Sequence, residues 1–183
     1  MDYRLSELVR VYDNDLPADL CDEIVRAFER DQGSAIGRNV DGQLSFDELD
    51  VDGLTEWLPI TVNLTARKDQ AFARYKQELG GRFPDEYDHE ALRIKRYRAE
   101  AKNEFRNHVD GYDRVSALRF MVCFWYLNDV ESGGETVFPH LRMKVSAKRG
   151  RLIMFPPFWM YEHAGLMPLS GNKYIISTYL RFK

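Results

Sequence analysis

The chain has 183 residues, of which 44% are hydrophobic and 30% are charged, and its formal net charge at pH 7 is −3. This balance indicates a globular protein that can bury a substantial core, and the lack of a long apolar run argues against a membrane-spanning segment. The first residues do not resemble a secretory signal, and the two cysteines, Cys21 and Cys123, cannot form a dense disulfide framework. We therefore expect a cytoplasmic protein with buried free thiols and no membrane partner.

Two helices are predicted in the first half of the chain. The first starts at Asp15-Leu16-Pro17 and ends before Gly33, and its apolar stripe consists of Leu20, Ile24, Val25 and Phe28. The second runs over about 55–79 and is stopped by Gly80-Gly81. Because residues 1–89 contain no motif of a particular chemistry, we interpret them as mainly helical support.

The segment between these helices, residues 33–53, is rich in polar and acidic residues. Its aspartates are Asp41, Asp47, Asp50 and Asp52. They lack the regular spacing and the terminal ligand of a calcium-binding loop. We therefore predict a mobile polar loop, which is either simply solvated or able to cover a bound substrate.

Short strands dominate the prediction from about residue 90 onward. Apolar or alternating runs predict strands over 92–98, 115–127, 136–138, 143–147, 151–155 and 173–182. Gly133-Gly134 is expected to form a turn with positive φ between two of these strands. Since no flexible linker or internal repeat interrupts the chain, we predict a single α+β domain over 1–183, β-rich in its second half.

His108-Val109-Asp110 is the first part of a candidate metal site. In a strand, residues i and i+2 point to the same side, so His108 and Asp110 are expected to face a shared interior. The run before it alternates in the same way and places on one face Arg93, Lys95 and Tyr97. A three-residue pattern of this kind also occurs by chance, so it needs support from elsewhere in the chain.

That support comes from His163 and Lys173. With His108 and Asp110, His163 would give two imidazoles and one carboxylate, a set that binds one face of Fe(II) and leaves positions open for a cosubstrate and O2. Lys173 follows His163 at a short distance. A cationic side chain there can bind the remote carboxylate of a keto-acid whose other end chelates the metal.

Three ordered pieces of the second half lie around these residues. The first is Arg96-Tyr97, then Phe105 and His108-Val109-Asp110; the second is YLNDVESGGETVFP over 126–139; the third is GRLIMFP over 150–156, then His163-Ala164-Gly165 and Gly171-Asn172-Lys173. In order and spacing these pieces resemble the prolyl 4-hydroxylase-like family of the Fe(II)/2-oxoglutarate-dependent dioxygenases. The resemblance covers about residues 90–183.

The resemblance implies a fold, a cofactor set and roles for five residues. The fold would be a double-stranded β-helix, or jelly roll, with residues 90–183 as its catalytic core. His108, Asp110 and His163 would ligate Fe(II). Lys173 would pair with the C5 carboxylate of 2-oxoglutarate, and Tyr97 would donate a hydrogen bond to the same group. With O2 as second cosubstrate and ascorbate as a candidate reductant, the products would be succinate, CO2 and a hydroxylated carbon.

Some of these residues have competing interpretations. His140 could supply the second imidazole, although only His163 has a lysine after it at the family spacing. Lys173 could be an ordinary solvated charge, and Tyr97 could be a packing residue. Arg181 shares the strand parity of Lys173 and could assist a carboxylate, although a surface ion pair is more usual so near the C-terminus.

The substrate is the least constrained part of the prediction. The aromatic run 155–161 is either core packing or a wall beside the iron, and we expect at least Trp159 or Tyr161 to approach the substrate opening. The motif set favours a prolyl residue of a peptide or protein, with a free amino acid or another small metabolite as the alternative.

Two further classes of function compete with an oxygenase that acts on a peptide or a small molecule. A nucleic-acid partner is less favoured because the net charge is −3. A catalytically silent jelly roll that binds a metal or a ligand stays open, although the complete candidate iron and keto-acid set argues against it. The sequence does not predict the oligomeric state.

Overall fold

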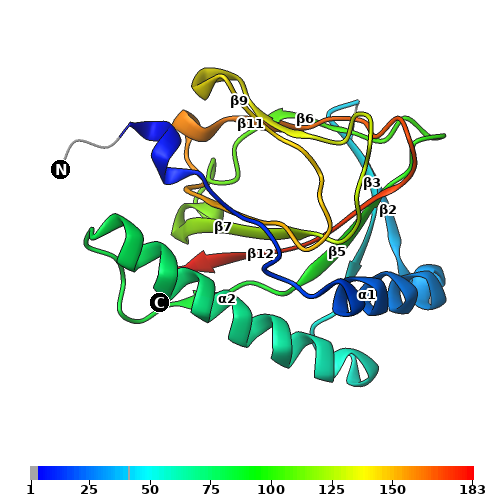
Figure 1. Cartoon of the computed structure of the whole chain (residues 1–183), viewed down its shortest axis with the longest axis horizontal. Helices are drawn as coiled ribbons and strands as arrows, with labels where there is room; N and C mark the ends of the chain where they lie inside the picture. Colours follow the sequence, from blue (N-terminus) through cyan, green and yellow to red (C-terminus); the bar gives the residue numbers. More distant parts are fainter. Residues whose placement is uncertain (1–3, 41) are drawn as a thin grey trace.

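A computed structural model describes residues 4–40 and 42–183 of the chain. Its main feature is a curled antiparallel sheet with two α-helices on one outer face (Figure 1). In Figure 1, strands β6, β9 and β11 lie above strands β5, β7 and β12, and the helices α1 and α2 lie below. The interior between the two layers of strands is where the candidate site residues meet.

The helices follow the predicted apolar stripes. Helix α1, Ala18–Asp31, begins directly after Pro17 and buries Cys21, Ile24, Ala27 and Phe28. Helix α2, Leu58–Leu79, follows a short 3-10 helix at Thr55–Trp57. It ends at Gly80, whose φ of +61° is a conformation that glycine adopts without steric cost. Among the described residues, no helix combines the length and the apolar character that crossing a membrane requires.

Twelve strands form the sheet in the described part of the chain. They are β1 Arg10–Tyr12, β2 Ile36–Val40, β3 Leu44–Asp50, β4 Asp88–His89, β5 Arg93–Tyr97, β6 Phe105–His108, β7 Arg119–Tyr126, β8 Thr136–Phe138, β9 Met143–Val145, β10 Leu152–Phe155, β11 His163–Gly165 and β12 Lys173–Arg181. Their order is β1-β10-β7-β12-β5-β3-β6-β11-β8-β9, with β2 beside β3 and β4 beside β12. Strand β3 therefore joins the two layers.

The prediction of a mobile loop over 33–53 is wrong. This segment contains the antiparallel hairpin of β2 and β3, and β3 continues the sheet beside β5. Its acidic residues face basic residues of β5, with Asp47 opposite Arg96 and a distance of 3.0 Å between Asp47 Oδ2 and Arg96 Nε. Asp41 lies outside the described residues.

All six strands predicted for the second half are present, but the prediction was incomplete. Strand β7 begins at Arg119 and not at residue 115, because a 3-10 helix at Ser116–Leu118 precedes it. The Asp113 carboxylate accepts a hydrogen bond of 2.7 Å from the Ser116 N–H and fixes that turn. Strands β6 and β11 were missed, and both carry candidate metal ligands.

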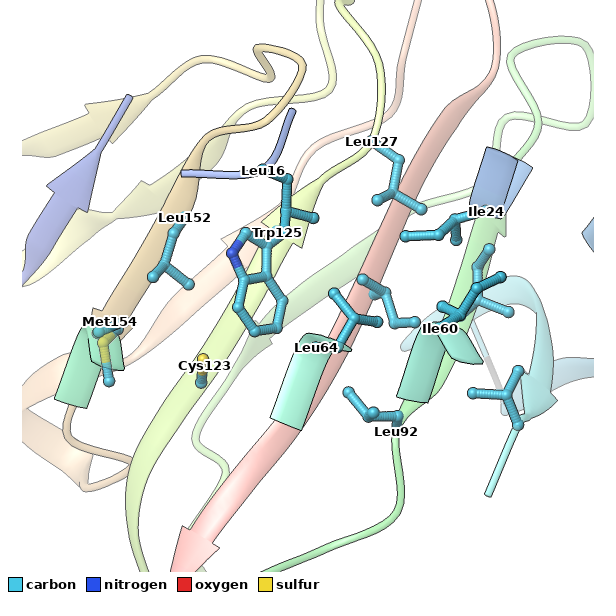
Figure 2. Packing of buried hydrophobic residues seen from close by; sticks show 14 of the residues in the cluster. Leu16, Ile24, Ile60, Leu64, Leu92, Cys123, Trp125, Leu127, Leu152 and Met154 are labelled. Atoms are coloured by element: carbon cyan, nitrogen blue, oxygen red, sulfur yellow. The ribbon is translucent and has the colours of Figure 1, made fainter. Parts of the chain in front are cut away.

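Hydrophobic residues pack on both sides of the sheet. One cluster lies between the helices and the outer face of the sheet, where Trp125 and Cys123 of β7 meet Leu64 of α2 (Figure 2). A second cluster fills the inside of the curl around Phe138, Phe155 and other aromatic residues. Cys21 and Cys123 are buried free thiols, as the sequence predicted.

Candidate metal centre

One group of metal-binding side chains is present within residues 4–40 and 42–183, and it consists of His108, Asp110 and His163. Their candidate ligand atoms all lie within 4.8 Å of one another. His163 Nε2 is 3.5 Å from Asp110 Oδ2, and His108 Nε2 is 4.0 Å from Asp110 Oδ1. The sheet brings them together because His108 and His163 are paired residues of the neighbouring strands β6 and β11.

Asp110 reaches this position in a way that the strand-parity argument did not anticipate. His108 and Asp110 face a shared interior, as expected, but strand β6 ends at His108, so they do not do so as members of one strand. Asp110 lies in the following loop, where its N–H donates to the Pro157 carbonyl at 3.1 Å. Its own carbonyl accepts a hydrogen bond from Arg119 Nη1 at 2.9 Å. These contacts with two other segments, and not the pleat of a strand, set the position of Asp110.

Backbone carbonyls orient both imidazoles. His108 Nδ1 lies 2.7 Å from the Arg106 carbonyl, and His163 Nδ1 lies 3.1 Å from the Tyr161 carbonyl. A carbonyl only accepts, so each Nδ1 carries the proton and each Nε2 presents a lone pair toward Asp110. Burial lowers the pKa of His108 to about 4 and also lowers the pKa of His163. Both rings are therefore neutral near pH 7, as metal ligands must be.

Asp110 has one bonded and one free oxygen. Oδ1 accepts a hydrogen bond of 2.6 Å from the Tyr179 hydroxyl, whereas Oδ2 is buried without a partner among the described residues. Burial alone would raise the pKa of this carboxyl, but His163, His108 and the Tyr179 hydrogen bond together hold it below its usual range. A buried, ionised oxygen without a partner is costly unless a cation binds it. The donor set therefore fits a divalent transition metal.

Lys173 lies in the same cavity, and it is almost fully buried at 2% exposure. Its Nζ donates to the carbonyls of Gly134 and Leu166, both at 3.2 Å, and lies 4.1 Å from the centre of the Tyr97 ring. No carboxylate forms an ion pair with it in the described part of the chain. Burial lowers the pKa of Lys173 to about 7, so a carboxylate ligand would find a desolvated partner there.

Comparison with known families identifies the class of site. Residues 92–181 match the family described as the 2OG-Fe(II) oxygenase superfamily. Residues 92–181, about half of the chain, belong to this superfamily. The family match and the three clustered ligands support Fe(II) as the metal and 2-oxoglutarate as the cosubstrate, as the sequence predicted.

Individual relatives of this oxygenase agree with that membership. "Probable prolyl 4-hydroxylase 11" of Arabidopsis thaliana is 33% identical over 73 residues, which is 36% of this chain and 24% of the relative. The chain thus spans about a quarter of the length of that relative.

Solved structures resemble the oxygenase over nearly its whole length. A viral collagen prolyl hydroxylase of Paramecium bursaria Chlorella virus-1 has a TM-score of 0.77 at 22% identity, covering 96% of this chain and 97% of its own. A Pseudomonas putida prolyl-4-hydroxylase has a TM-score of 0.74 at 18% identity, covering 96% and 93%. A Trichoplax adhaerens prolyl hydroxylase has a TM-score of 0.78 at 16% identity, covering 95% and 83%. At these identities the likeness shows the fold, and the predicted jelly roll is confirmed.

Strand parity places further side chains of the oxygenase inside the cavity. Strand β12 contributes every second residue from Lys173 to Tyr179, namely Lys173, Ile175, Ser177 and Tyr179. Strand β5 contributes Tyr97, which is opposite Lys173 in the β5–β12 register, and Lys95.

The sequence prediction missed Tyr126 and Thr136, which also line the cavity. The Tyr126 hydroxyl and Thr136 Oγ1 are 2.6 Å apart. Tyr126 ends β7 and Thr136 begins β8. They are the first and last residues of the YLNDVESGGET segment, and this was the one signal that could have pointed to them.

The remaining candidates lie outside this cavity. Trp159 is 71% exposed, and Tyr161 is buried with a hydroxyl that has no partner among the described residues. The expectation that one of them borders the substrate opening stays a prediction. His140 is paired with Glu162 at 3.1 Å and lies apart from the three clustered ligands, so it is not the second imidazole. Arg181 is not among the residues that line the cavity.

Proposed function

We propose that the chain hydroxylates an unactivated C–H bond of a prolyl residue in a peptide or protein, with conversion of 2-oxoglutarate and O2 to succinate and CO2. The observation that carries the proposal is one cavity that contains both an unpaired Asp110 oxygen between two oriented imidazoles and a buried lysine without a carboxylate partner. A catalytically silent binding module has no need of both features.

The three ligands have distinct tasks in this proposal. His108 and His163 would bind Fe(II) through Nε2, and Asp110 would bind it through Oδ2, while Tyr179 holds the other carboxylate oxygen. Because these three ligands come from one side, positions on the other side of the metal stay available to 2-oxoglutarate and O2. When bound, Fe(II) and 2-oxoglutarate supply the oxidising chemistry that a protein side chain cannot provide.

Lys173 and Tyr97 would bind the far end of the cosubstrate. The Lys173 ammonium would pair with the C5 carboxylate, and the Tyr97 hydroxyl would donate to the same group. Both side chains are at most 3% exposed, so they exclude water from that end of the cavity. Exclusion of water strengthens the ion pair and fixes the keto-acid in one orientation toward the metal.

A prolyl substrate is supported by the names of the relatives. The Arabidopsis relative is called a probable prolyl 4-hydroxylase, and the Trichoplax structure contains a hypoxia inducible factor peptide fragment. A peptide or protein substrate follows by analogy with these proteins.

The test combines two measurements on anaerobically purified protein. Fe(II), 2-oxoglutarate and O2 are supplied with proline-containing peptides or with free amino acids, and succinate and substrate mass are measured together. A peptide that gains one oxygen in step with succinate supports the proposal. If only a free amino acid gains oxygen, the substrate class is free amino acids and not peptides. If iron-loaded protein forms no succinate, the proposed oxygenase activity is refuted. Asp110→Ala is the matched negative control.

A further inference from the structure

Lys95 is a second buried lysine in the cavity, and neither the metal nor the C5 carboxylate of the cosubstrate accounts for it. It lies on β5, faces the interior together with Tyr97, and is 8% exposed. In the strand registers it is opposite Ile175 of β12 and Glu48 of β3. A charged side chain is seldom buried in this way unless it is paired.

The present contacts of Lys95 leave its charge poorly satisfied. Glu48 Oε2 is 3.9 Å from Lys95 Nζ, which is beyond hydrogen-bond distance. The other oxygen of Glu48, Oε1, is engaged by Arg38 at 3.1 Å. The Phe46 ring, 5.3 Å from Nζ, offers a weak cation–π contact. Lys95 therefore has donors that remain available to a ligand in the cavity.

Lys95, which is opposite Ile175, lies nearer than Lys173 to Tyr179 along the β5–β12 register. Lys173 is opposite Tyr97 and beside the Gly134 and Leu166 carbonyls, far along β12 from Tyr179, which bonds Asp110. Lys95 is thus the cation on the metal side.

A chain of charged side chains connects Lys95 with the surface of the protein. Glu48 links it to Arg38, whose side chain is 49% exposed on the outer strand of the β2–β3 hairpin. Every residue of β2 is exposed. Lys173 Nζ instead donates to two backbone carbonyls, those of Gly134 and Leu166, which do not link it to an exposed cation.

We propose that Lys95 binds a carboxylate of the substrate, so that the chain prefers substrates with an anionic group close to the carbon that is oxidised. This inference rests on the proposed hydroxylase function and narrows its substrate class. The carboxylate could be the C-terminus of a peptide that ends in proline, an acidic side chain next to an internal proline, or the carboxylate of a free amino acid.

Binding is tested without turnover, on the whole chain loaded with Fe(II) and 2-oxoglutarate under anaerobic conditions. Calorimetry compares ligand pairs that differ only in one charge: a peptide ending in proline against its C-terminal amide, Asp-Pro against Asn-Pro peptides, and proline against prolinamide. The proteins are wild type, Lys95→Met, Lys95→Arg and, as a charge-matched control at an exposed site, Lys148→Met. The pair with the largest difference identifies the source of the carboxylate.

The wild type is expected to bind one carboxylate ligand about ten- to a hundredfold more tightly than its amide, the usual range for a charge-assisted hydrogen bond. Lys95→Met should reduce this preference to about one, Lys95→Arg should keep part of it, and Lys148→Met should keep all of it. The Kd of 2-oxoglutarate, measured in the same way, should change little in Lys95→Met.

Three results would overturn the proposal. Weaker binding of 2-oxoglutarate itself in Lys95→Met would assign Lys95 to the cosubstrate. If Lys95→Met lowers the affinity for carboxylate and amide ligands equally, the role of Lys95 is structural. If the wild type prefers no carboxylate ligand over its amide, Lys95 does not bind a substrate carboxylate. The proposed hydroxylase function is tested separately, because its failure would appear as a lack of succinate when the wild-type protein is supplied with O2.

Discussion

Asp110 connects the residue-scale chemistry with stability. Its Oδ2 is buried without a partner in the described part of the chain, and an oxygen in that state destabilises a fold by roughly 1–3 kcal/mol. A divalent metal removes this penalty, so metal binding and folding are coupled at this residue.

Asp110→Ala should therefore abolish Fe(II) binding without unfolding the protein, because it removes a ligand and an unsatisfied buried charge together. The measurement is iron bound per chain after anaerobic loading and desalting, with circular dichroism as the check on folding. His140→Ala is the matched control, since His140 pairs with Glu162 away from the cluster. Iron retained by Asp110→Ala at the wild-type level would disprove the ligand assignment.

Lys173 predicts a pH dependence of cosubstrate binding. Burial lowers its pKa to about 7, and a bound carboxylate raises it. Below that pH the free protein already has the ammonium form, so binding is insensitive to pH. Above it the lysine must take up a proton on binding, and the Kd of 2-oxoglutarate should rise by up to about tenfold per pH unit.

Calorimetry at about pH 8 in two buffers of different ionisation enthalpy measures that proton uptake. His108, with a pKa of about 4, is neutral throughout this range. Lys173→Arg is the control, because a guanidinium remains charged and should show no uptake. Wild-type binding without proton uptake would show that Lys173 is already charged or does not contact the cosubstrate.

The site was only partly predictable from single residues. His108, Asp110, His163 and Lys173 could be predicted because their types and order suit one chemistry. The position of Lys95 beside Glu48 depends on the register between β5 and β3, which are far apart in sequence. No local pattern contains that register.

At the scale of elements, the turn around Gly133 fixes one side of the cavity beside Lys173, where we propose that the cosubstrate binds. Gly133 and Gly134 both have φ of +74°, as their sequence predicted. A Cβ on Gly133 would lie 2.3 Å from the Met167 carbonyl oxygen. The same turn presents the Gly134 carbonyl to Lys173.

Gly133→Ala should destabilise the fold and weaken 2-oxoglutarate binding, because a left-handed backbone and a clash with backbone both oppose the methyl group. Gly53→Ala is the control, since its φ is +81° but a Cβ there meets no atom within 4 Å. In urea unfolding, Gly133→Ala should cost roughly 1–3 kcal/mol more than Gly53→Ala. An equal loss of unfolding free energy in the two variants would mean that the turn adjusts easily and does not position Lys173.

Helices and strands differed in how far the sequence predicted them. The stripes of α1 and α2 are local patterns of one helix face, so both helices were predicted to within a few residues. The β2–β3 hairpin was missed because its acids suggested a solvated loop. Asp47 in fact pairs with Arg96, a partner on another strand that the segment itself does not reveal.

At the scale of the whole molecule, one hydrophobic cluster joins the two halves of the chain. Trp57 and Leu64 from the helical half pack with Trp125 and Ile176 from the β-rich half. This shared cluster supports the prediction of a single domain over 1–183.

Leu64→Ala should lower the stability of the whole molecule by about 2–5 kcal/mol, since Leu64 is fully buried between α2 and the sheet (Figure 2). Val62→Ala, on the same helix at 61% exposure, should change it by less than about 0.5 kcal/mol. Urea unfolding followed by circular dichroism and by tryptophan fluorescence should give one coincident transition for each variant. Two separate unfolding transitions would show that the chain consists of two domains that unfold independently.

The central claim is that the three clustered ligands and Lys173 form a working oxygenase centre. Turnover under 18O2 with Fe(II), 2-oxoglutarate and a peptide that the protein hydroxylates tests this claim most directly. We predict one labelled oxygen in succinate and one in the peptide hydroxyl, both absent in Asp110→Ala. Succinate without the label, or the same label in Asp110→Ala, would contradict the account.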